Sequence, residues 1–166
     1  MSNQYTIALA GNPNTGKSTI FNALTGSRQH VGNWPGKTVE KKEGSWRYGD
    51  TDYKVVDLPG TYSLTAYSLE EVIARDYVIN EQPDMVVTVV EAANLERNLY
   101  LALQVLEMGV KVVIALNMSD VAESRGFKID VPRLSRALNV PVIPTVASKG
   151  EGLDGLKQAI AETAAV

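Results

Sequence analysis

Short apolar runs alternate with segments of helical periodicity along most of the 166-residue chain. Apolar and β-branched runs of about four to eight residues are typical of buried strands, whereas apolar side chains at every third or fourth position indicate amphipathic helices. The runs predict strands over residues 5–10, 39–48, 53–57, 84–90, 110–117 and 140–146. Helical spacing predicts helices over 17–25, 68–80, 95–108 and 130–138, and a final one marked by Leu153, Leu156 and Ile160.

Turn and cap residues refine this pattern. Gly49-Asp50 separates the second predicted strand from the third, which favours an antiparallel hairpin. Ser68 followed by Glu71 fits a capping box, in which Ser68 caps the helix and Glu71 reaches back to the cap. Segments 26–37 and 58–67 combine glycine, proline and polar residues, so we predict two long loops there.

Strands that alternate with helices predict an α/β fold, in which a mostly parallel sheet carries helices on both faces. We expect six strands, one of them antiparallel because of the hairpin. Ligands of such sheets bind at the carboxyl ends of the strands. The motifs described below follow strands and are therefore expected to meet at that edge.

Composition narrows the classes of function. The length suits one domain over residues 1–166. The chain has no cysteine and a single histidine, His30, which excludes disulfides, thiolate metal sites and multi-histidine metal centres. A net charge of −3 gives no bulk electrostatic reason to expect nucleic-acid binding. The apolar runs are shorter than a membrane span and the N-terminus lacks signal-peptide features, so we expect a cytosolic domain.

The segment GNPNTGKS matches G-x-x-x-x-G-K-[ST] in full and lies between a predicted strand and a predicted helix. In that context, backbone N–H groups and the helix N-terminus cradle phosphates. Lys17 is expected to bridge the outer phosphates, and the Ser18 hydroxyl to bind Mg²⁺. The residues predicted to contact the nucleotide here are Gly11, Asn12, Asn14, Thr15, Gly16, Lys17, Ser18 and Thr19.

Asp57-Leu-Pro-Gly60 follows the third predicted strand. Asp57 is expected to hold Mg²⁺ through a water, and Gly60 to bring its N–H close to a terminal phosphate. Thr38 would complete the Mg²⁺ shell and place its N–H at the γ-phosphate, which would order loop 26–37 in the triphosphate state. We therefore predict Lys17, Thr38 and Gly60 as catalytic residues. Trp34 is expected to pack on the body of the domain.

Asn117-Met-Ser-Asp120 follows the fifth predicted strand and carries candidate base contacts. The Asp120 carboxylate can accept hydrogen bonds from guanine N1–H and the exocyclic amine, whereas adenine would leave it unpaired. Asn117 is expected to tether the phosphate loop, and Met118 to cover a face of the base where a lysine is usual. A second base-contacting loop is expected at Val146, Ala147 and Ser148, with the Ala147 N–H as donor to the guanine carbonyl.

Together the motifs resemble those of a small Ras-like GTPase, and more closely the cytosolic G domain of the ferrous iron transport protein B (FeoB) family. GNWPGKTVE and NLERNLYL are more specific to that family than the phosphate-loop pattern. The resemblance covers nearly the whole chain and is carried by Gly11–Gly26, Val31–Gly44, Val55–Thr65, Asn94–Gln104 and Ala115–Asp120.

The resemblance implies a domain that binds and hydrolyses GTP and regulates Fe²⁺ uptake through a membrane domain further along the chain. That domain and the helical domain that usually follows the G domain are absent from residues 1–166. The implied partners are guanine nucleotide and those two domains, with a homo-oligomer allowed and no nucleic acid. We therefore expect a soluble fragment of a protein whose G domain lies at the cytoplasmic face of the membrane. Asn14 stands where related potassium-stimulated GTPases help bind K⁺, so GTP or GDP, Mg²⁺ and K⁺ are the expected cofactors.

Thr61 stands where Ras-type enzymes carry the glutamine that orients the attacking water. Threonine is too short to copy a glutamine, so we expect slow intrinsic hydrolysis, stimulated by K⁺, with backbone groups positioning the water. Two alternatives stay open. One is a soluble GTPase in ribosome assembly or tRNA modification, and the other is a non-catalytic guanine-nucleotide sensor.

Overall fold

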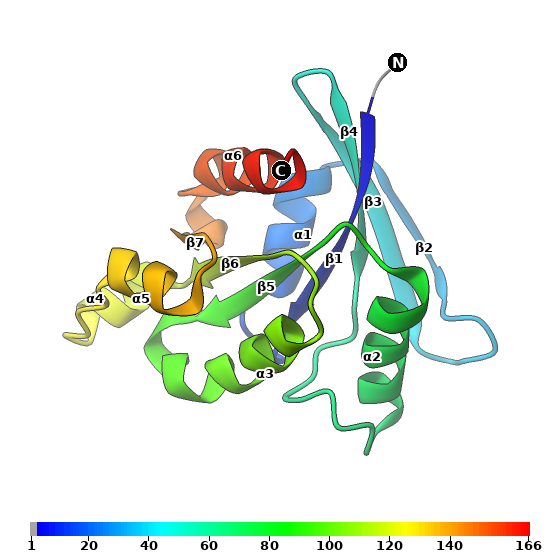
Figure 1. Cartoon of the computed structure of the whole chain (residues 1–166), viewed down its shortest axis with the longest axis horizontal. Helices are drawn as coiled ribbons and strands as arrows, with labels where there is room; N and C mark the ends of the chain where they lie inside the picture. Colours follow the sequence, from blue (N-terminus) through cyan, green and yellow to red (C-terminus); the bar gives the residue numbers. More distant parts are fainter. Residues whose placement is uncertain (1–2) are drawn as a thin grey trace.

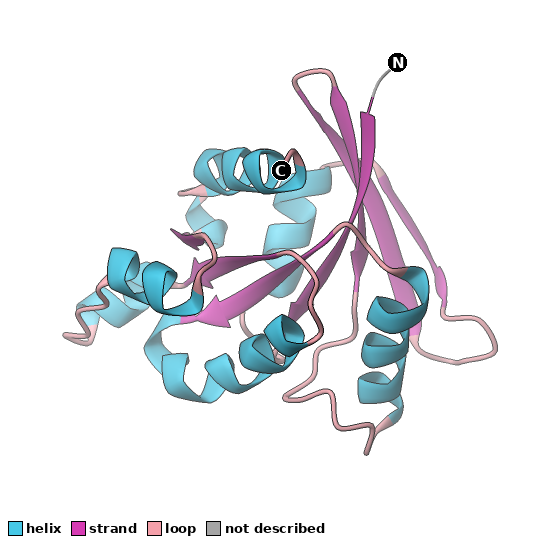
Figure 2. Ribbon diagram, viewed as in Figure 1, coloured by secondary structure: helices cyan, strands magenta, loops and turns pink. Residues whose placement is uncertain are grey.

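A seven-stranded sheet with helices on both faces organises residues 3–166, the part of the chain that the computed structural model describes (Figures 1 and 2). Its strands are β1 (Asn3–Gly11), β2 (Gln29–Asn33), β3 (Glu40–Tyr48), β4 (Thr51–Asp57), β5 (Met85–Glu91), β6 (Val112–Asn117) and β7 (Val142–Pro144). The α-helices are α1 (Lys17–Thr25), α2 (Leu69–Glu81), α3 (Leu95–Glu107), α4 (Ser119–Ser124), α5 (Val131–Leu138) and α6 (Leu153–Ala164).

The strand order is β2-β3-β4-β1-β5-β6-β7, and among these strands β3 alone runs opposite to the others, antiparallel to both β2 and β4. The parallel register aligns the carboxyl ends of the central strands: Leu9 pairs with Asp57, and Glu91 pairs with Asn117. The segments that follow β1, β4 and β6 therefore start from one edge of the sheet. The predicted α/β class and the β3–β4 hairpin are confirmed.

Side-chain alternation along the strands divides the core into two layers. On β5, Val86 and Val90 lie in the layer under α2 and α3, whereas Val87 and Val89 lie in the layer under α1 and α6. Both layers are filled mainly by aliphatic side chains with almost no exposure. No helix of residues 3–166 is both long and apolar enough to cross a membrane.

The structure corrects three local predictions. The loop predicted over 26–37 contains β2, so the sheet has seven strands and not six. All five β2 residues are exposed, and the strand is held by pairing with β3, so it has no apolar pattern that would reveal it. The strand predicted over 140–146 shortens to β7, and α4 forms where no helix was predicted.

The N-terminus of α2 follows its predicted capping box only in part. Ser68 Oγ accepts a hydrogen bond from the Glu71 N–H at 3.1 Å, as predicted. The Glu71 carboxylate turns to the preceding loop, where it accepts hydrogen bonds from the Thr65 hydroxyl at 2.7 Å and the Thr65 N–H at 3.2 Å. The cap is therefore one-sided, and Glu71 fastens the loop before α2.

Candidate functional site

The loop between β1 and α1 has a left-handed backbone at Asn14 and Gly16, two residue types that tolerate this conformation. Gly16 caps α1 in the left-handed region (φ 86°), and a Cβ there would lie 2.2 Å from Asn117 Nδ2. Only glycine fits at that position. The Thr15 hydroxyl donates to the Asn12 carbonyl at 2.9 Å, which closes the loop on itself. Asn14 is exposed and also left-handed (φ 65°), a conformation that asparagine tolerates better than most residues.

Lys17 joins the phosphate loop to the end of β4. Its ammonium forms an ion pair with the Asp57 carboxylate and donates to the Leu58 carbonyl at 2.8 Å. Burial raises the pKa of Asp57, and the neighbouring Lys17 opposes that rise. Ser18 and Thr19 are exposed in the first turn of α1. The two predicted motifs thus meet at the sheet edge.

Gly60 and Thr61 lie against the phosphate loop. The Thr61 N–H donates to the Gly11 carbonyl at 3.1 Å, and a Cβ on Gly60 would lie 3.4 Å from Pro13. This places the Gly60 backbone beside the loop that is predicted to hold phosphates. Thr61 is only 5% exposed. Its side chain therefore has little contact with solvent, and the expectation that it is not catalytic stays a prediction.

No hydrogen bond joins Thr38 to Ser18 or Asp57 in residues 3–166. It is exposed in the β2–β3 connection, which lies well away from α1 (Figure 1). Backbone hydrogen bonds from Trp34 to Val39 and from Lys37 to Trp34, both 2.9 Å, close this connection. The Trp34 side chain is buried and packs edge-on against Tyr77 of α2, so its predicted packing role is confirmed. The role of Thr38 as a Mg²⁺ ligand stays a prediction.

Asn117 connects the predicted base loops to the phosphate loop. Its Nδ2 donates to the Thr15 carbonyl at 2.9 Å, which is the tether predicted from the sequence. Its Oδ1 accepts from the Thr145 hydroxyl at 2.9 Å and from the Ala147 N–H at 3.1 Å. The N–H predicted to meet the guanine carbonyl therefore has a protein partner here. Thr145 was missed because it is a buried threonine outside every motif.

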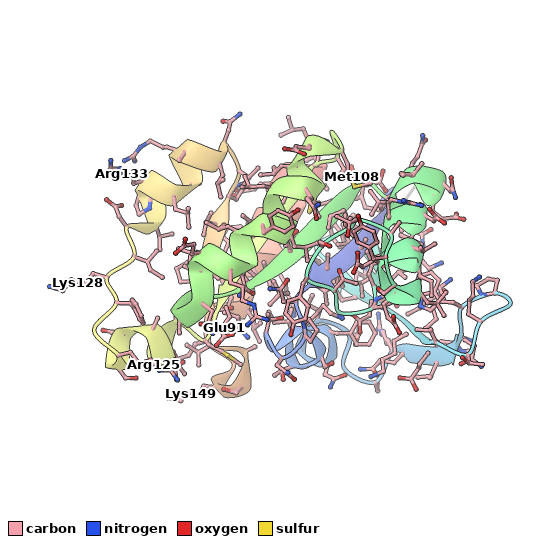
Figure 3. All side chains as sticks on the ribbon, turned by 90° about the horizontal axis from the view of Figure 1, so that it is seen from below. Glu91, Met108, Arg125, Lys128, Arg133 and Lys149 are labelled. Atoms are coloured by element: carbon pink, nitrogen blue, oxygen red, sulfur yellow. The ribbon has the colours of Figure 1, made fainter. Side chains whose placement is uncertain are left out.

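Asp120 lies beside the second base loop. Lys149 Nζ is 3.3 Å from Asp120 Oδ2, an ion pair that the sequence motifs did not reveal. Lys149 and Arg125 of the α4 region lie at the same end of the molecule (Figure 3).

The Met118 backbone is left-handed, and its Cε lies 3.8 Å from where a Gly16 Cβ would be. Val146 is buried and Ser148 exposed next to Ala147. The two predicted base-contacting segments are thus adjacent.

A Mg²⁺ ion fits the donors that the structure supplies. The Ser18 hydroxyl and the Asp57 carboxylate are hard oxygen ligands, and Mg²⁺ is commonly bound by one or two such groups together with substrate phosphates. Among residues 3–166 there is no cluster of three or more His, Cys, Asp or Glu side chains that could hold a metal by itself. Any metal at this edge would thus share its shell with a ligand.

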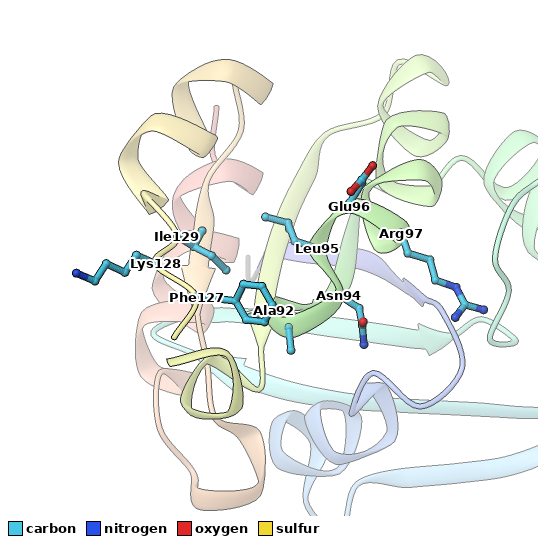
Figure 4. A pocket seen from close by; sticks show the side chains of 9 residues that line it. Ala92, Asn94, Leu95, Glu96, Arg97, Phe127, Lys128 and Ile129 are labelled. Carbon is cyan, nitrogen blue, oxygen red and sulfur yellow. The ribbon is translucent and has the colours of Figure 1, made fainter. Parts of the chain in front are cut away.

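A hollow of about 650 Å³ lies apart from these residues, between the start of α3 and the segment after α4 (Figure 4). Phe127 and Ile129 face it from one side, and Ala92 and Leu95 from the other. It contains no residue predicted from the sequence to bind nucleotide or metal. Apart from Thr38 in the β2–β3 connection, the residues predicted from the sequence lie in and next to the loops after β1, β4, β6 and β7.

Comparison with known proteins identifies the family of this chain. The family described as ferrous iron transport protein B matches residues 5–160. The chain belongs to this family. Among its relatives, the Fe(2+) transporter FeoB of Escherichia coli (strain K12) is 54% identical over 159 residues, which is 93% of this chain and 21% of the relative. The FeoB transporter of Salmonella typhimurium gives the same figures. The chain thus spans about a fifth of the length of these FeoB relatives.

Solved FeoB structures share the fold. The G domain of FeoB from Methanococcus jannaschii is 52% identical, with a TM-score of 0.88 and 99% coverage of both chains. The cytosolic domain of T. maritima FeoB in its GMPPNP form is 49% identical, with a TM-score of 0.93 over 96% of this chain and 64% of that one. The predicted family and the P-loop GTPase fold are confirmed.

Proposed function

We propose that this chain binds GTP and GDP and hydrolyses GTP, as the regulatory G domain of a longer ferrous iron transporter. The observation that carries the proposal is the bridging role of Asn117, whose side chain contacts the phosphate loop at Thr15 and the base loop at Ala147. One nucleotide would therefore touch loops that already act as a unit. The GDP and GMPPNP forms of the T. maritima cytosolic domain support this reading.

Asp120 would select guanine over adenine. Its carboxylate can only accept hydrogen bonds, which matches the adjacent N1–H and amine donors of guanine and mismatches adenine. The ion pair with Lys149 holds the carboxylate next to the second base loop. Met118 supplies an apolar side chain for one face of the base without adding a charge. The Ala147 N–H would turn from Asn117 to the guanine carbonyl when nucleotide binds.

Phosphate and metal binding would rearrange the Lys17–Asp57 pair. Phosphate oxygens offer Lys17 a stronger partner, and its departure frees the Asp57 carboxylate to act with Ser18 on Mg²⁺. When bound, Mg²⁺ neutralises charge between the outer phosphates. Lys17 and the Gly60 N–H would stabilise the γ-phosphate, joined by Thr38 once the β2–β3 connection moves. The exposed carboxamide of Asn14 would hold K⁺ near the same charge.

Hydrolysis is expected to be slow because Thr61, at the position of the Ras-type glutamine, is too short to orient water. In the full-length protein, the helical and transmembrane domains would be the partners that respond to the nucleotide. The transport of Fe²⁺ itself would reside in the membrane domain, with this domain at its cytoplasmic face. The family match supports that assignment, because the FeoB transporters that the chain resembles are longer proteins of which it spans 21%.

Two measurements test the proposal. Calorimetry should detect GDP binding and no ADP binding, and phosphate release from GTP should be abolished in Lys17→Ala. Uptake of ADP with no heat from GDP would overturn the base assignment. Tight GDP binding with no phosphate release from wild-type protein would instead make the domain a nucleotide sensor.

A further inference from the structure

The helix α3 carries the family-like segment NLERNLYLALQ, to which the proposed function gives no role. Its start is fixed to the sheet by Asn98, which is 4% exposed. Asn98 Oδ1 accepts from the Glu91 N–H at 3.2 Å, and its Nδ2 donates to the Asn94 carbonyl at 2.9 Å. Buried Leu101 and Val105 continue the attachment along the helix. Thus α3 is a rigid support at the edge where the nucleotide loops lie.

Two polar side chains on α3 contact the loop that follows Gly60. The Leu64 N–H donates to Gln104 Oε1 at 2.7 Å. The Arg97 guanidinium lies 4.7 Å from the centre of the Tyr62 ring, within cation–π range. Arg97 extends from α3 on the side away from Phe127 and Lys128 (Figure 4).

The same loop is fastened to the phosphate loop just before these contacts. The Thr61 N–H bonds to the Gly11 carbonyl at 3.1 Å. Gly60 therefore leads into a stretch held by the phosphate loop at Thr61 and by α3 at Tyr62 and Leu64. A backbone held at such short intervals has little freedom, so the α3 contacts limit where the Gly60 N–H can point.

We propose that Arg97 and Gln104 are positioning residues for GTP. They hold the loop after Gly60 so that the Gly60 N–H reaches the γ-phosphate. This inference rests on the proposed function. GDP has no γ-phosphate, so its binding depends on the phosphate loop and the base loops. Loss of the α3 contacts should therefore weaken the response to GTP while leaving GDP binding intact.

The decisive variant is Gln104→Ala, with Gln104→Glu as the version that keeps an acceptor oxygen for the Leu64 N–H. We expect Gln104→Ala to lower kcat for GTP and the GMPPNP-to-GDP affinity ratio about five-fold each, the factor of one net hydrogen bond. Amide exchange at Leu64 should become faster. Gln104→Glu should keep kcat, the affinity ratio and the exchange rate at Leu64 close to their wild-type values. Arg97→Ala and Arg97→Lys form a second pair, in which lysine keeps a cation over Tyr62.

The matched control is Gln158→Ala, since Gln158 is exposed on α6 and bonds only to Glu162 of the same helix, at 2.9 Å. The inference is overturned if Gln104→Ala keeps the wild-type kcat and affinity ratio, or if it loses GDP binding in parallel with GTP turnover. The proposed function fails separately, when wild-type protein releases no phosphate. The affinity ratio and the Leu64 exchange rate then still decide the role of Gln104.

Discussion

The side-chain amide of Asn117 donates to the backbone carbonyl of Thr15 across 2.9 Å, although 102 positions separate the two residues in the sequence. The other end of the amide accepts from Thr145 and Ala147. A primary amide can donate and accept at once, which lets one buried side chain hold loops from three parts of the sequence. Aspartate or leucine of similar size lacks that combination.

Asn117→Ala should therefore damage both folding and binding. It leaves the Thr15 carbonyl, the Thr145 hydroxyl and the Ala147 N–H without their partner in a buried region, and each unpaired buried group costs about 1–3 kcal/mol. We expect a loss of at least about 3 kcal/mol in the free energy of unfolding, measured by urea denaturation, and GDP affinity at least about ten-fold weaker. Thr145→Val, which removes only one bond, should cost about 1 kcal/mol. Equal losses in both variants would contradict the bridging role.

Asp120→Asn should change the base that is recognised. Guanine presents two donors to this position, whereas xanthine presents a carbonyl oxygen beside N1–H, which suits the donor and acceptor of an amide. We expect calorimetry to show weaker GDP binding, by about 100-fold or more, and new binding of xanthosine diphosphate. Lys149→Ala tests the neighbour alone: its largely exposed ion pair with Asp120 should contribute less than about 1 kcal/mol. Unchanged GDP affinity in Asp120→Asn would remove Asp120 from the base site.

Glu71 should give the loop before α2 a dependence on pH. Hydrogen bonds from Thr65 and Ser63 lower the pKa of Glu71 below its ordinary value of 4.5. The folded state then binds fewer protons than the unfolded chain, so ionised Glu71 stabilises the fold above its unfolded pKa. That stability is lost as the pH falls through the lower, folded pKa.

Glu71→Gln isolates this effect because its amide oxygen does not titrate. The wild-type advantage in urea midpoint over Glu71→Gln should be present in full above the unfolded pKa of 4.5 and should be lost as the pH falls through the lower, folded pKa. Glu70→Gln is the matched control, since Glu70 is exposed in the same helical turn. A wild-type advantage that persists unchanged in acid would refute the assignment.

The sequence motifs predicted local features such as the Gly16 cap and the Asn117 tether. The hydrophobic pattern did not predict the strand and the long-range contact that surround them. Gly16 and Asn117 could be placed from sequence because a left-handed helix cap and an amide tether need those residue types. The strand β2 could not, because its stability comes from pairing with β3 and its five residues are all exposed. Gln104 likewise contacts Leu64 from forty positions away, and one sequence carries no signal for such a pair.

Asn14 tests the proposed dependence on K⁺. Asn14→Ala would also strain the left-handed backbone (φ 65°), so Asn14→Gly is the cleaner change: it removes the carboxamide and suits the conformation. We expect wild-type GTP turnover in K⁺ to exceed that in Na⁺ by about ten-fold or more, and Asn14→Gly to lose that stimulation while it still binds GDP. Equal turnover in the two salts, or full stimulation of Asn14→Gly, would exclude a K⁺ role.

Trp34 should report whether Thr38 reaches the metal. The hydrogen bonds that close the β2–β3 connection involve the Trp34 backbone, and its ring packs on Tyr77 with Lys41 above it at 4.8 Å. Bringing Thr38 to Ser18 would require this packing to break, which would expose the indole to water.

The chain has two tryptophans, so Trp46→Phe leaves Trp34 as the single tryptophan, which can be excited selectively over the tyrosines. Its emission should shift to longer wavelength with GMPPNP and Mg²⁺ and stay constant with GDP and Mg²⁺. Thr38→Ala in the same background should remove the shift, because the hydroxyl that draws the connection toward Mg²⁺ is gone. If GMPPNP binds without any change in Trp34 emission, Thr38 is not a ligand of the metal, and the β2–β3 connection keeps one conformation in both nucleotide states.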